Sequence, residues 1–257
     1  MGRVRIIAVA NQKGGVGKTT TAINLSACLA AAGKRVLAID ADQQGNTTSG
    51  LGLDKNGGPL TVYHIFLGEA DVNGTKQPTC VEGLEVIPAN INLTGAEIEL
   101  IGKERREFIL REELEKVKAD YDFIIIDCPP SLNLITINAL TAADTVLVPI
   151  QCEYFALEGL EQLLHTVNLV KKRLNPALEI EGIVFTMFDA RTNLSLQVVE
   201  EVKRTLGQNV YRTIIPRNVR LGESPSHGLP IHMYDPRSKG AEAYAQLAEE
   251  VMEKEWN

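Results

Sequence analysis

The sequence contains few of the residues that would point to disulfides, metal clusters or a membrane. Its four cysteines lie far apart at positions 28, 80, 128 and 152, with no C-x-x-C pair and no histidine at zinc-finger spacing. We therefore expect ordinary buried or semi-buried thiols in a reducing compartment. No apolar run approaches the roughly 18 residues that suggest a membrane span, and no signal-peptide cleavage site follows Met1. These absences predict a cytoplasmic protein.

Aromatic residues are also scarce, at 5% of the 257 residues, whereas hydrophobic residues as a whole make up 44% and include many Ile, Val and Leu. This composition is typical of a parallel sheet that is covered by helices on both faces. The length is sufficient for one large α/β domain with a well-buried core, and no linker-like stretch suggests a second. We expect residues 1–257 to form a single domain.

Strand and helix patterns alternate along the chain, which indicates repeated βαβ units and a doubly wound, mostly parallel sheet. The predicted strands cover residues 4–10, 35–39, 84–88, 121–126, 146–150, 180–186 and 211–215. The predicted helices cover residues 20–32, 94–118 with a break near position 102, 156–174, 194–206 and 238–254. Residues 43–59 read as a loop with one helical turn, and residues 216–236 read as loop.

A glycine-rich loop follows the first predicted strand. Its sequence ends as the phosphate-binding pattern G-x-x-x-x-G-K-[ST] does, but a lysine, Lys13, stands at its start. Lys18 is expected to reach the β- and γ-phosphates of a nucleotide, and the Thr19 hydroxyl to bind Mg²⁺. A glycine-rich turn that binds nothing would not need these two residues directly after its last glycine. The predicted nucleotide-binding residues here are Lys13, Gly14, Gly15, Val16, Gly17, Lys18, Thr19 and Thr20.

The extra lysine, Lys13, lies at the mouth of this loop. From there its side chain cannot easily fold back onto phosphates that are bound by its own chain. We expect it instead to be available to a nucleotide that is held by a second copy of the protein. Such an arrangement would couple ATP binding to the formation of a homodimer.

Three aspartates follow predicted strands at their carboxyl ends, where open α/β sheets bind their ligands. Asp40 and Asp42 come after the second strand, and Asp127 ends the long apolar strand. A carboxylate beside Mg²⁺ and the γ-phosphate can hold a metal-bound water or orient the attacking water. We predict that Asp42 positions the hydrolytic water and that Asp127 acts on the Mg²⁺ shell through a water. The alternative is that these polar residues simply end strands, and a direct role for Asp40 stays open.

Together these residues resemble the deviant Walker-A ATPases of the ParA/MinD type, and more narrowly the short chromosome-partitioning ParA proteins called Soj. The resemblance covers nearly the whole chain and depends on six segments. They are residues 13–20 (KGGVGKTT), 40–46 (DADQQGN), 124–131 (IIIDCPPS), 153–159 (EYFALEG), 189–192 (DART) and 215–220 (IPRNVR). One departure is Gln43, where many members have Pro, and it should leave the two neighbouring aspartates intact.

The resemblance implies an ATP-driven switch. Members of the family bind ATP, form a sandwich dimer in which the signature lysine crosses to the partner's phosphates, and then bind double-stranded DNA without sequence preference. A ParB (Spo0J)-type partner stimulates slow hydrolysis and releases the dimer, so the protein would be associated with the nucleoid. By position, the catalytic residues would be Lys13, Lys18 and Asp42. Pro216 and Asn218 look like the residues that meet the adenine.

DNA binding seems at odds with the formal net charge of −7. Residues 203–239, however, contain seven basic residues against two acids, which is a local charge of +5. Because phosphate contacts supply most non-specific affinity, a local patch that dimerisation doubles matters more than the net charge. The resemblance points to Arg191 and Arg220 as phosphate contacts. The alternative is a solvated basic face without a partner.

Two other functions share the same loop. A membrane-cycling ATPase of the MinD kind would be expected to end in a basic amphipathic helix, but from Glu242 onward the sequence has five acids and one lysine, Lys254. An iron–sulfur or metal carrier would need cysteine thiolates at a shared interface. Cys128 follows Asp127 directly, yet no second cysteine lies at a useful spacing. We therefore expect no membrane partner and no metal cluster.

Overall fold

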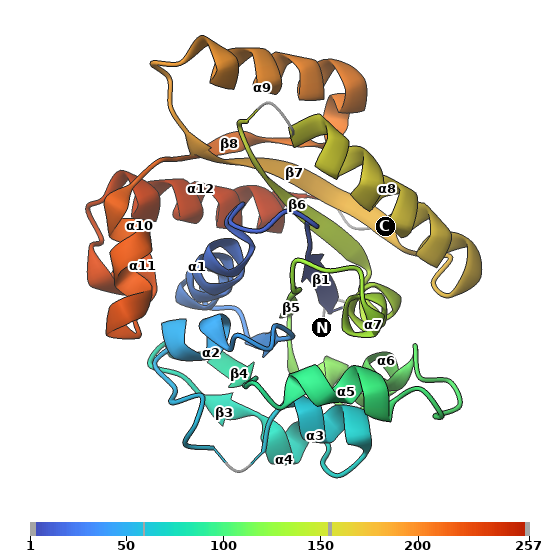
Figure 1. Cartoon of the computed structure of the whole chain (residues 1–257). Helices are drawn as coiled ribbons and strands as arrows, with labels where there is room; N and C mark the ends of the chain where they lie inside the picture. The colour runs from blue at the N-terminus through green and yellow to red at the C-terminus, as the bar shows by residue number, and fades with distance from the viewer. Residues whose placement is uncertain (1–3, 59, 154–155, 255–257) are drawn as a thin grey trace.

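The computed structural model describes residues 4–58, 60–153 and 156–254, and its eight strands form one sheet (Figure 1). The strand order is β3-β4-β2-β5-β1-β6-β7-β8, and every neighbouring pair is parallel except β3 with β4. The strands are β1 (Arg5–Val9), β2 (Val36–Asp40), β3 (Gln77–Pro78), β4 (Leu84–Ile87), β5 (Phe123–Asp127), β6 (Thr145–Gln151), β7 (Glu179–Phe188) and β8 (Val210–Pro216). This topology confirms the predicted doubly wound α/β fold.

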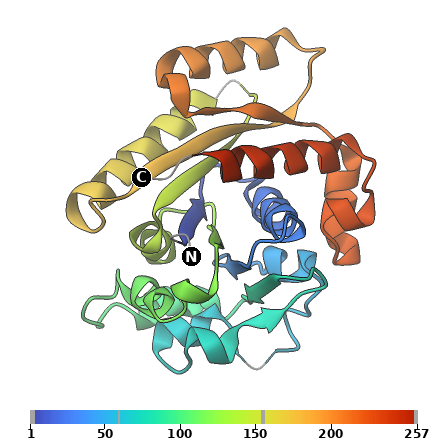
Figure 2. The same ribbon diagram turned by 180° about the vertical axis from the view of Figure 1, so that it is seen from behind.

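Helices cover both faces of the sheet, as Figures 1 and 2 show from opposite sides. The longer helices are α1 (Lys18–Ala31), α7 (Leu134–Ala142), α8 (Ala156–Arg173), α9 (Asn193–Leu206) and α12 (Lys239–Glu253). The shorter α-helices are α2 (Asn46–Gly50), α3 (Val62–Leu67), α4 (Val72–Thr75), α5 (Leu93–Glu99), α6 (Ile109–Glu115), α10 (Val219–Glu223) and α11 (Ile231–Tyr234). Three 3₁₀ turns are η1 (Lys118–Asp120), η2 (Gly207–Asn209) and η3 (Ser224–His227).

The central strands are buried on both sides, which is why their sequences are apolar without alternation. In β1, Ile6 and Ala8 belong to a core with the residues of α3 and α5–α9, whereas Ile7 and Val9 belong to a second core with α1 and α12. Helix α1 is therefore enclosed between the sheet and α12. This burial fixes the position of α1, and so of its first turn, which directly follows the phosphate loop.

Several details differ from the sequence-based expectation. The break predicted near position 102 in the helix over residues 94–118 is present but wider than expected, since α5 ends at Glu99 and α6 begins only at Ile109. Between them Arg105 has a φ of +53°, which is incompatible with a continuing right-handed helix. Helix α7 was not predicted, since it is almost entirely buried and so shows little of the amphipathic period that reveals a surface helix.

Other differences are smaller. The stretch 216–236, read as loop, contains α10, η3 and α11, while the single helical turn expected in 43–59 is present as α2. Strand β3 lies at the sheet edge, where Pro78 is tolerated. Cys80 is exposed, whereas the other three cysteines are buried. Tyr154, Phe155 and the C-terminal residues from position 255, which belong to segments used in the sequence analysis, lie outside the described residues.

Candidate nucleotide site

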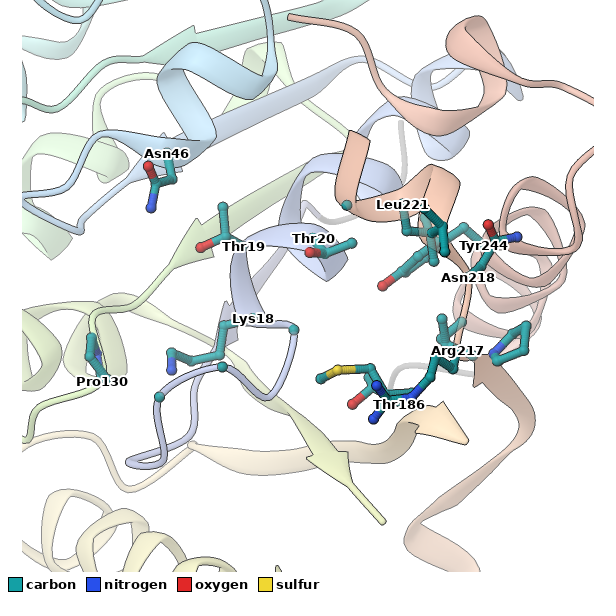
Figure 3. Close-up of a pocket in the computed structure, with 18 of the residues that line it drawn as sticks. Lys18, Thr19, Thr20, Asn46, Pro130, Thr186, Arg217, Asn218, Leu221 and Tyr244 are labelled. Carbon is teal, nitrogen blue, oxygen red and sulfur yellow. The ribbon is translucent and has the colours of Figure 1, made fainter. Parts of the chain in front are cut away.

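A cavity of about 570 Å³ opens at the carboxyl ends of the central strands, beside the start of α1 (Figure 3). Residues of the predicted phosphate loop line one side of it, together with Asp42. The other side is formed by Thr186 and Met187 at the end of β7 and by the segment 215–219. The fold thus brings together most of the nucleotide-binding residues that the sequence predicts, from Gly14 in the phosphate loop to Asn218 near the C-terminal end of the chain.

The phosphate loop connects β1 to α1 and needs its glycines. Gly15 and Gly17 have φ values of +75° and +87°, a region that other residues rarely adopt. The side chain of Asn11 anchors the start of the loop, because its Nδ2 donates to the carbonyl oxygen of Pro149 in β6 at 2.7 Å. Its Oδ1 accepts from the backbone N–H of Lys13 at 3.0 Å. Sequence reasoning gave no role to Asn11, although a polar residue directly after a buried strand was a usable signal.

Lys18, the first residue of α1, is only 7% exposed, and its side chain lies across the loop (Figure 3). The amine donates to the carbonyl oxygen of Lys13 at 3.0 Å. Burial lowers the pKa of Lys18, while the nearby Asp127, Cys128 and Asp42 act in the opposite direction. The amine is therefore held at the cavity next to groups that favour its charged form, as a phosphate-binding lysine requires.

Asp127 ends β5 and is almost completely buried. Its Oδ2 accepts from the Thr47 hydroxyl at 2.7 Å, but its Oδ1 has no hydrogen-bond partner among the described residues. Burial and the nearby Asp40 raise the pKa of Asp127, and the hydroxyls of Thr47 and Thr19 oppose this shift. An unpartnered buried carboxylate oxygen close to Thr19 suits the hydration shell of a divalent cation. The oxygen atoms of Thr19 and Asp127 therefore fit the predicted role of these two residues in Mg²⁺ binding.

The structure gives Asp40 and Asp42 different surroundings. Asp42 lines the cavity, and its Oδ1 accepts from the backbone N–H of Gln44 at 3.0 Å. Asp40 is fully buried and is not among the lining residues; it accepts from the backbone N–H and the hydroxyl of Thr48 at 2.8 and 2.7 Å. Asp40 also accepts from the backbone N–H of Asp42 at 3.1 Å. Its observed contacts thus hold α2 and the backbone of Asp42 in place.

The far side of the cavity contains Pro216 and Asn218, which were expected at the adenine. Pro216 ends β8 in register with Phe188 of β7, and the Asn218 side chain caps α10 by accepting from the N–H of Arg220 at 2.9 Å. Among the lining residues that sequence reasoning missed are Met187 and Tyr244. Met187 has a φ of +49° in an otherwise extended strand, and such strain is common at binding sites.

Lys13 does not line the cavity of its own chain. Its amine instead pairs with Glu153 Oε2 at 2.5 Å, and its side chain remains 34% exposed. Lys13 therefore lies at the rim of the site, next to the lining residue Gly14, and its partly exposed side chain is paired with Glu153.

The two arginines predicted to contact DNA are on the surface, and each has an acidic neighbour. Arg191 is 87% exposed and donates to both carboxylate oxygens of Asp189, at 2.9 and 2.7 Å. Arg220 contacts Glu223 at 2.8 Å and Asp235 at 3.5 Å. The Arg191 guanidinium holds the pKa of Asp189 well below its usual range. Each of these two guanidinium groups is therefore partly neutralised by an acidic side chain in the structure.

No helix in the described part of the chain combines the length and apolarity needed to cross a membrane.

The chain is similar to known proteins over nearly its whole length. A family model described as an AAA domain matches residues 4–180. The chain is 62% identical over 247 residues to the sporulation initiation inhibitor protein Soj of Bacillus subtilis (strain 168), with 96% of this chain and 98% of that protein covered. It is 53% identical over 251 residues to the chromosome-partitioning ATPase Soj of Treponema pallidum (strain Nichols), with 98% of each covered.

Solved structures show the same fold. Cobyrinic acid a,c-diamide synthase from Mycobacterium smegmatis, with bound ADP and magnesium, has a TM-score of 0.86 and 40% sequence identity; 97% of this chain and 94% of that chain are covered. The septum site-determining protein MinD from Pyrococcus horikoshii, in complex with Mg-ADP, has a TM-score of 0.82 and 28% identity, with 97% and 96% covered. Both relatives thus bind a nucleotide together with magnesium.

Proposed function

Because the chain belongs to the ParA/Soj family of chromosome-partitioning ATPases, we propose that it is an ATP-dependent dimerisation switch on DNA. It binds ATP and Mg²⁺ in the cavity beside α1, dimerises, binds double-stranded DNA without sequence preference, and hydrolyses ATP when a ParB-type partner stimulates it. The main support for this proposal is that the two lysines occupy different positions. Lys18 lines the cavity, whereas Lys13 lies at its rim.

The phosphates fit the loop Gly14–Thr20, with Lys18 as the cationic group. Thr19 and Asp127 would hold the metal ion, and the unpartnered Oδ1 of Asp127 supports this assignment. Mg²⁺, when bound, neutralises charge on the phosphate oxygens. The base would lie against Pro216 and Asn218, which line the far side of the cavity. The single sheet of the described residues supports one ATPase domain over residues 1–257.

Asp42 is proposed to orient the water that attacks the γ-phosphate. It faces the cavity, and its backbone is held by Asp40, so its carboxylate is well placed for a positioning role. In phosphoryl transfer the protein contributes mainly positioning and electrostatic stabilisation.

We expect Asp42→Ala to lower stimulated ATP hydrolysis by about 100-fold while ATP binding is retained. The variant should then accumulate as a DNA-bound dimer. Size-exclusion chromatography with light scattering, in ADP, ATP and ATP plus DNA, tests the switch and this variant together. Asp54→Ala is a matched control, because exposed Asp54 also accepts a backbone N–H two residues ahead, at 2.9 Å. A variant that remains monomeric in ATP would contradict the role given to Asp42.

Lys13 is proposed to reach the phosphates of a second copy. Its contact with Glu153 is partly exposed and so contributes little stability. When a second copy binds, Lys13 can therefore leave Glu153 and pair with a phosphate of the second copy's nucleotide at little energetic cost. Dimerisation would place two copies of the surface that carries Arg191 and Arg220 on one DNA segment, consistent with a protein associated with the nucleoid.

A membrane-cycling function of the MinD kind is less well supported. The described part of the last helix, α12, carries Glu242, Glu249, Glu250 and Glu253, and such a charge is repelled by anionic lipid. The curated relative from Bacillus subtilis is also much more similar to this chain than the MinD structure is, at 62% against 28% identity. We therefore propose DNA and not a membrane as the surface on which the dimer assembles.

We expect Arg191→Glu and Arg220→Glu to dimerise in ATP but to bind arbitrary duplex DNA at least about tenfold more weakly. Each change removes a phosphate-neutralising charge from both subunits, so the slope of log K against log salt should also fall by about one for each phosphate that is no longer neutralised. A filter-binding or anisotropy titration at several salt concentrations measures both. Arg111→Glu, an exposed arginine on α6, is the control for net charge. Wild-type DNA affinity in either variant would remove that arginine from the proposed surface.

A further inference from the structure

The phosphate loop is held not only by its own strand but also by a side chain from β7. The hydroxyl of Thr186, which is 2% exposed, donates to the carbonyl oxygen of Val16 at 2.8 Å. Thr186 is 170 residues away in sequence, and it reaches the loop because β7 pairs with β6, with Thr186 in register with Gln151. The methyl group of Thr186 also lies close to Gly17, within 3.6 Å of the position that a Cβ there would occupy.

The bonded carbonyl belongs to the peptide that joins Val16 to Gly17. A peptide is planar and trans, so its N–H points opposite to its carbonyl. Fixing the direction of the Val16 carbonyl therefore fixes the direction of the Gly17 N–H, which is one of the loop donors available to a phosphate. Turning this peptide over changes ψ of Val16 and φ of Gly17, and Gly17, which has a φ of +87°, lacks the side chain that would restrict this rotation. The hydroxyl of Thr186 limits the rotation that Gly17 would otherwise allow.

From this geometry we infer that Thr186 is a positioning residue for the phosphate loop, and that its hydroxyl keeps the Val16–Gly17 peptide in the orientation that binds phosphate. The inference rests on the proposed nucleotide-binding role of the loop. Thr186 acts through the loop backbone and not on the reacting atoms. Thr186 directly precedes Met187, which has a positive φ and lines the cavity. The end of β7 therefore contacts the phosphate loop through Thr186 and forms part of the cavity wall through Met187.

The test compares three variants by titration with MgADP, which avoids the dimer that ATP is proposed to form. Thr186→Val keeps the shape of the side chain but removes the donor, and we expect it to weaken MgADP binding by roughly 5- to 50-fold. Thr186→Ser keeps the donor and should bind within about twofold of the wild type. Thr141→Val is the matched control, because the buried Thr141 hydroxyl also donates to a backbone carbonyl, that of Ile137, at 2.7 Å in α7.

Steady-state kinetics gives a second measurement. If the hydroxyl orients the loop for binding, Thr186→Val should raise the KM for ATP more than it lowers kcat, and thermal unfolding of the nucleotide-free protein should match that of Thr141→Val. Wild-type MgADP affinity in Thr186→Val overturns the inference, as does a Ser variant that is as weak as Val or a Thr141→Val variant that is equally impaired. Failure of the wild-type protein to bind MgADP would instead overturn the proposed function.

Discussion

Lys18→Ala is expected to abolish measurable nucleotide binding at concentrations that saturate the wild type. Lys18 provides the positive charge at the cavity, and Asp42 and Asp127 lie close enough to influence its pKa. Removing the amine leaves these carboxylates facing the incoming phosphates without a cation from the loop. Loss of one partner of a desolvated charge pair costs about 3–4 kcal/mol, which is roughly 200- to 1,000-fold in Kd. Isothermal titration with MgADP measures the loss directly.

The control for this substitution is Lys103→Ala. The amine of Lys103 also donates to a backbone carbonyl, that of Phe66, at 3.2 Å, but it lies outside the cavity. Lys103→Ala should therefore bind MgADP as the wild type does. Lys18→Arg is informative as well, because it keeps the charge but adds a larger, planar group in a nearly buried place, and we expect it to bind poorly. Tight MgADP binding by Lys18→Ala would show that the phosphates lie elsewhere.

Much of this site could be predicted from sequence because its signals are local. The phosphate loop is one short segment, and Asp40 and Asp127 each follow a continuous apolar strand. Parallel strands place such residues at a common edge, and the register pairs Asp40 with Asp127. The strands themselves were evident from their composition, since β5 is buried along its whole length.

What could not be predicted depends on contacts between distant residues. The hydroxyl bond from Thr186 to Val16 follows only from the order β1-β6-β7, which no local pattern specifies. The basic stretch 203–239 is another example, because Arg204 and Arg212 pair with Glu201 and Glu250, which lie outside that stretch. The charge of +5 counted along residues 203–239 therefore overestimates the positive charge that this stretch presents in the folded protein. The role of Asp40 was left open for the same reason, because its contact with Thr48 becomes visible only when α2 is in place.

The clearest long-range feature is a buried charge at the opposite end of the sheet from the nucleotide cavity. Glu181, near the start of β7, is fully buried and forms an ion pair with Arg5 of β1. Its carboxylate also accepts from the hydroxyls of Thr145 and Tyr211, at 2.7 and 2.6 Å. Arg5 Nη1 donates in turn to the carbonyl oxygen of Val251 in α12 at 2.6 Å. One carboxylate thus joins β1, β6, β7 and β8, and through Arg5 it joins the last helix.

We expect Glu181→Leu to reduce the free energy of unfolding by about 3–5 kcal/mol, because it leaves the buried Arg5 guanidinium without this carboxylate. The two hydroxyls lose their acceptor as well. Burial and the Glu181 charge raise the pKa of Tyr211, so its hydroxyl remains a donor at neutral pH and needs a partner. Urea denaturation followed by circular dichroism gives the free energy, provided that the slope with urea is unchanged.

Glu179→Leu is the matched control, since Glu179 lies two residues earlier on the same strand but pairs with Lys171 in an exposed position. It should change stability by less than about 0.5 kcal/mol. The double variant Arg5→Met with Glu181→Leu separates charge from packing, because replacing both members of a buried pair by apolar residues is often close to neutral. If loss of the carboxylate that pairs with the Arg5 guanidinium causes the destabilisation, the double variant should be more stable than Glu181→Leu alone. Equal stability of these two variants would show that the two hydroxyls without an acceptor, and not the buried charge, determine the effect.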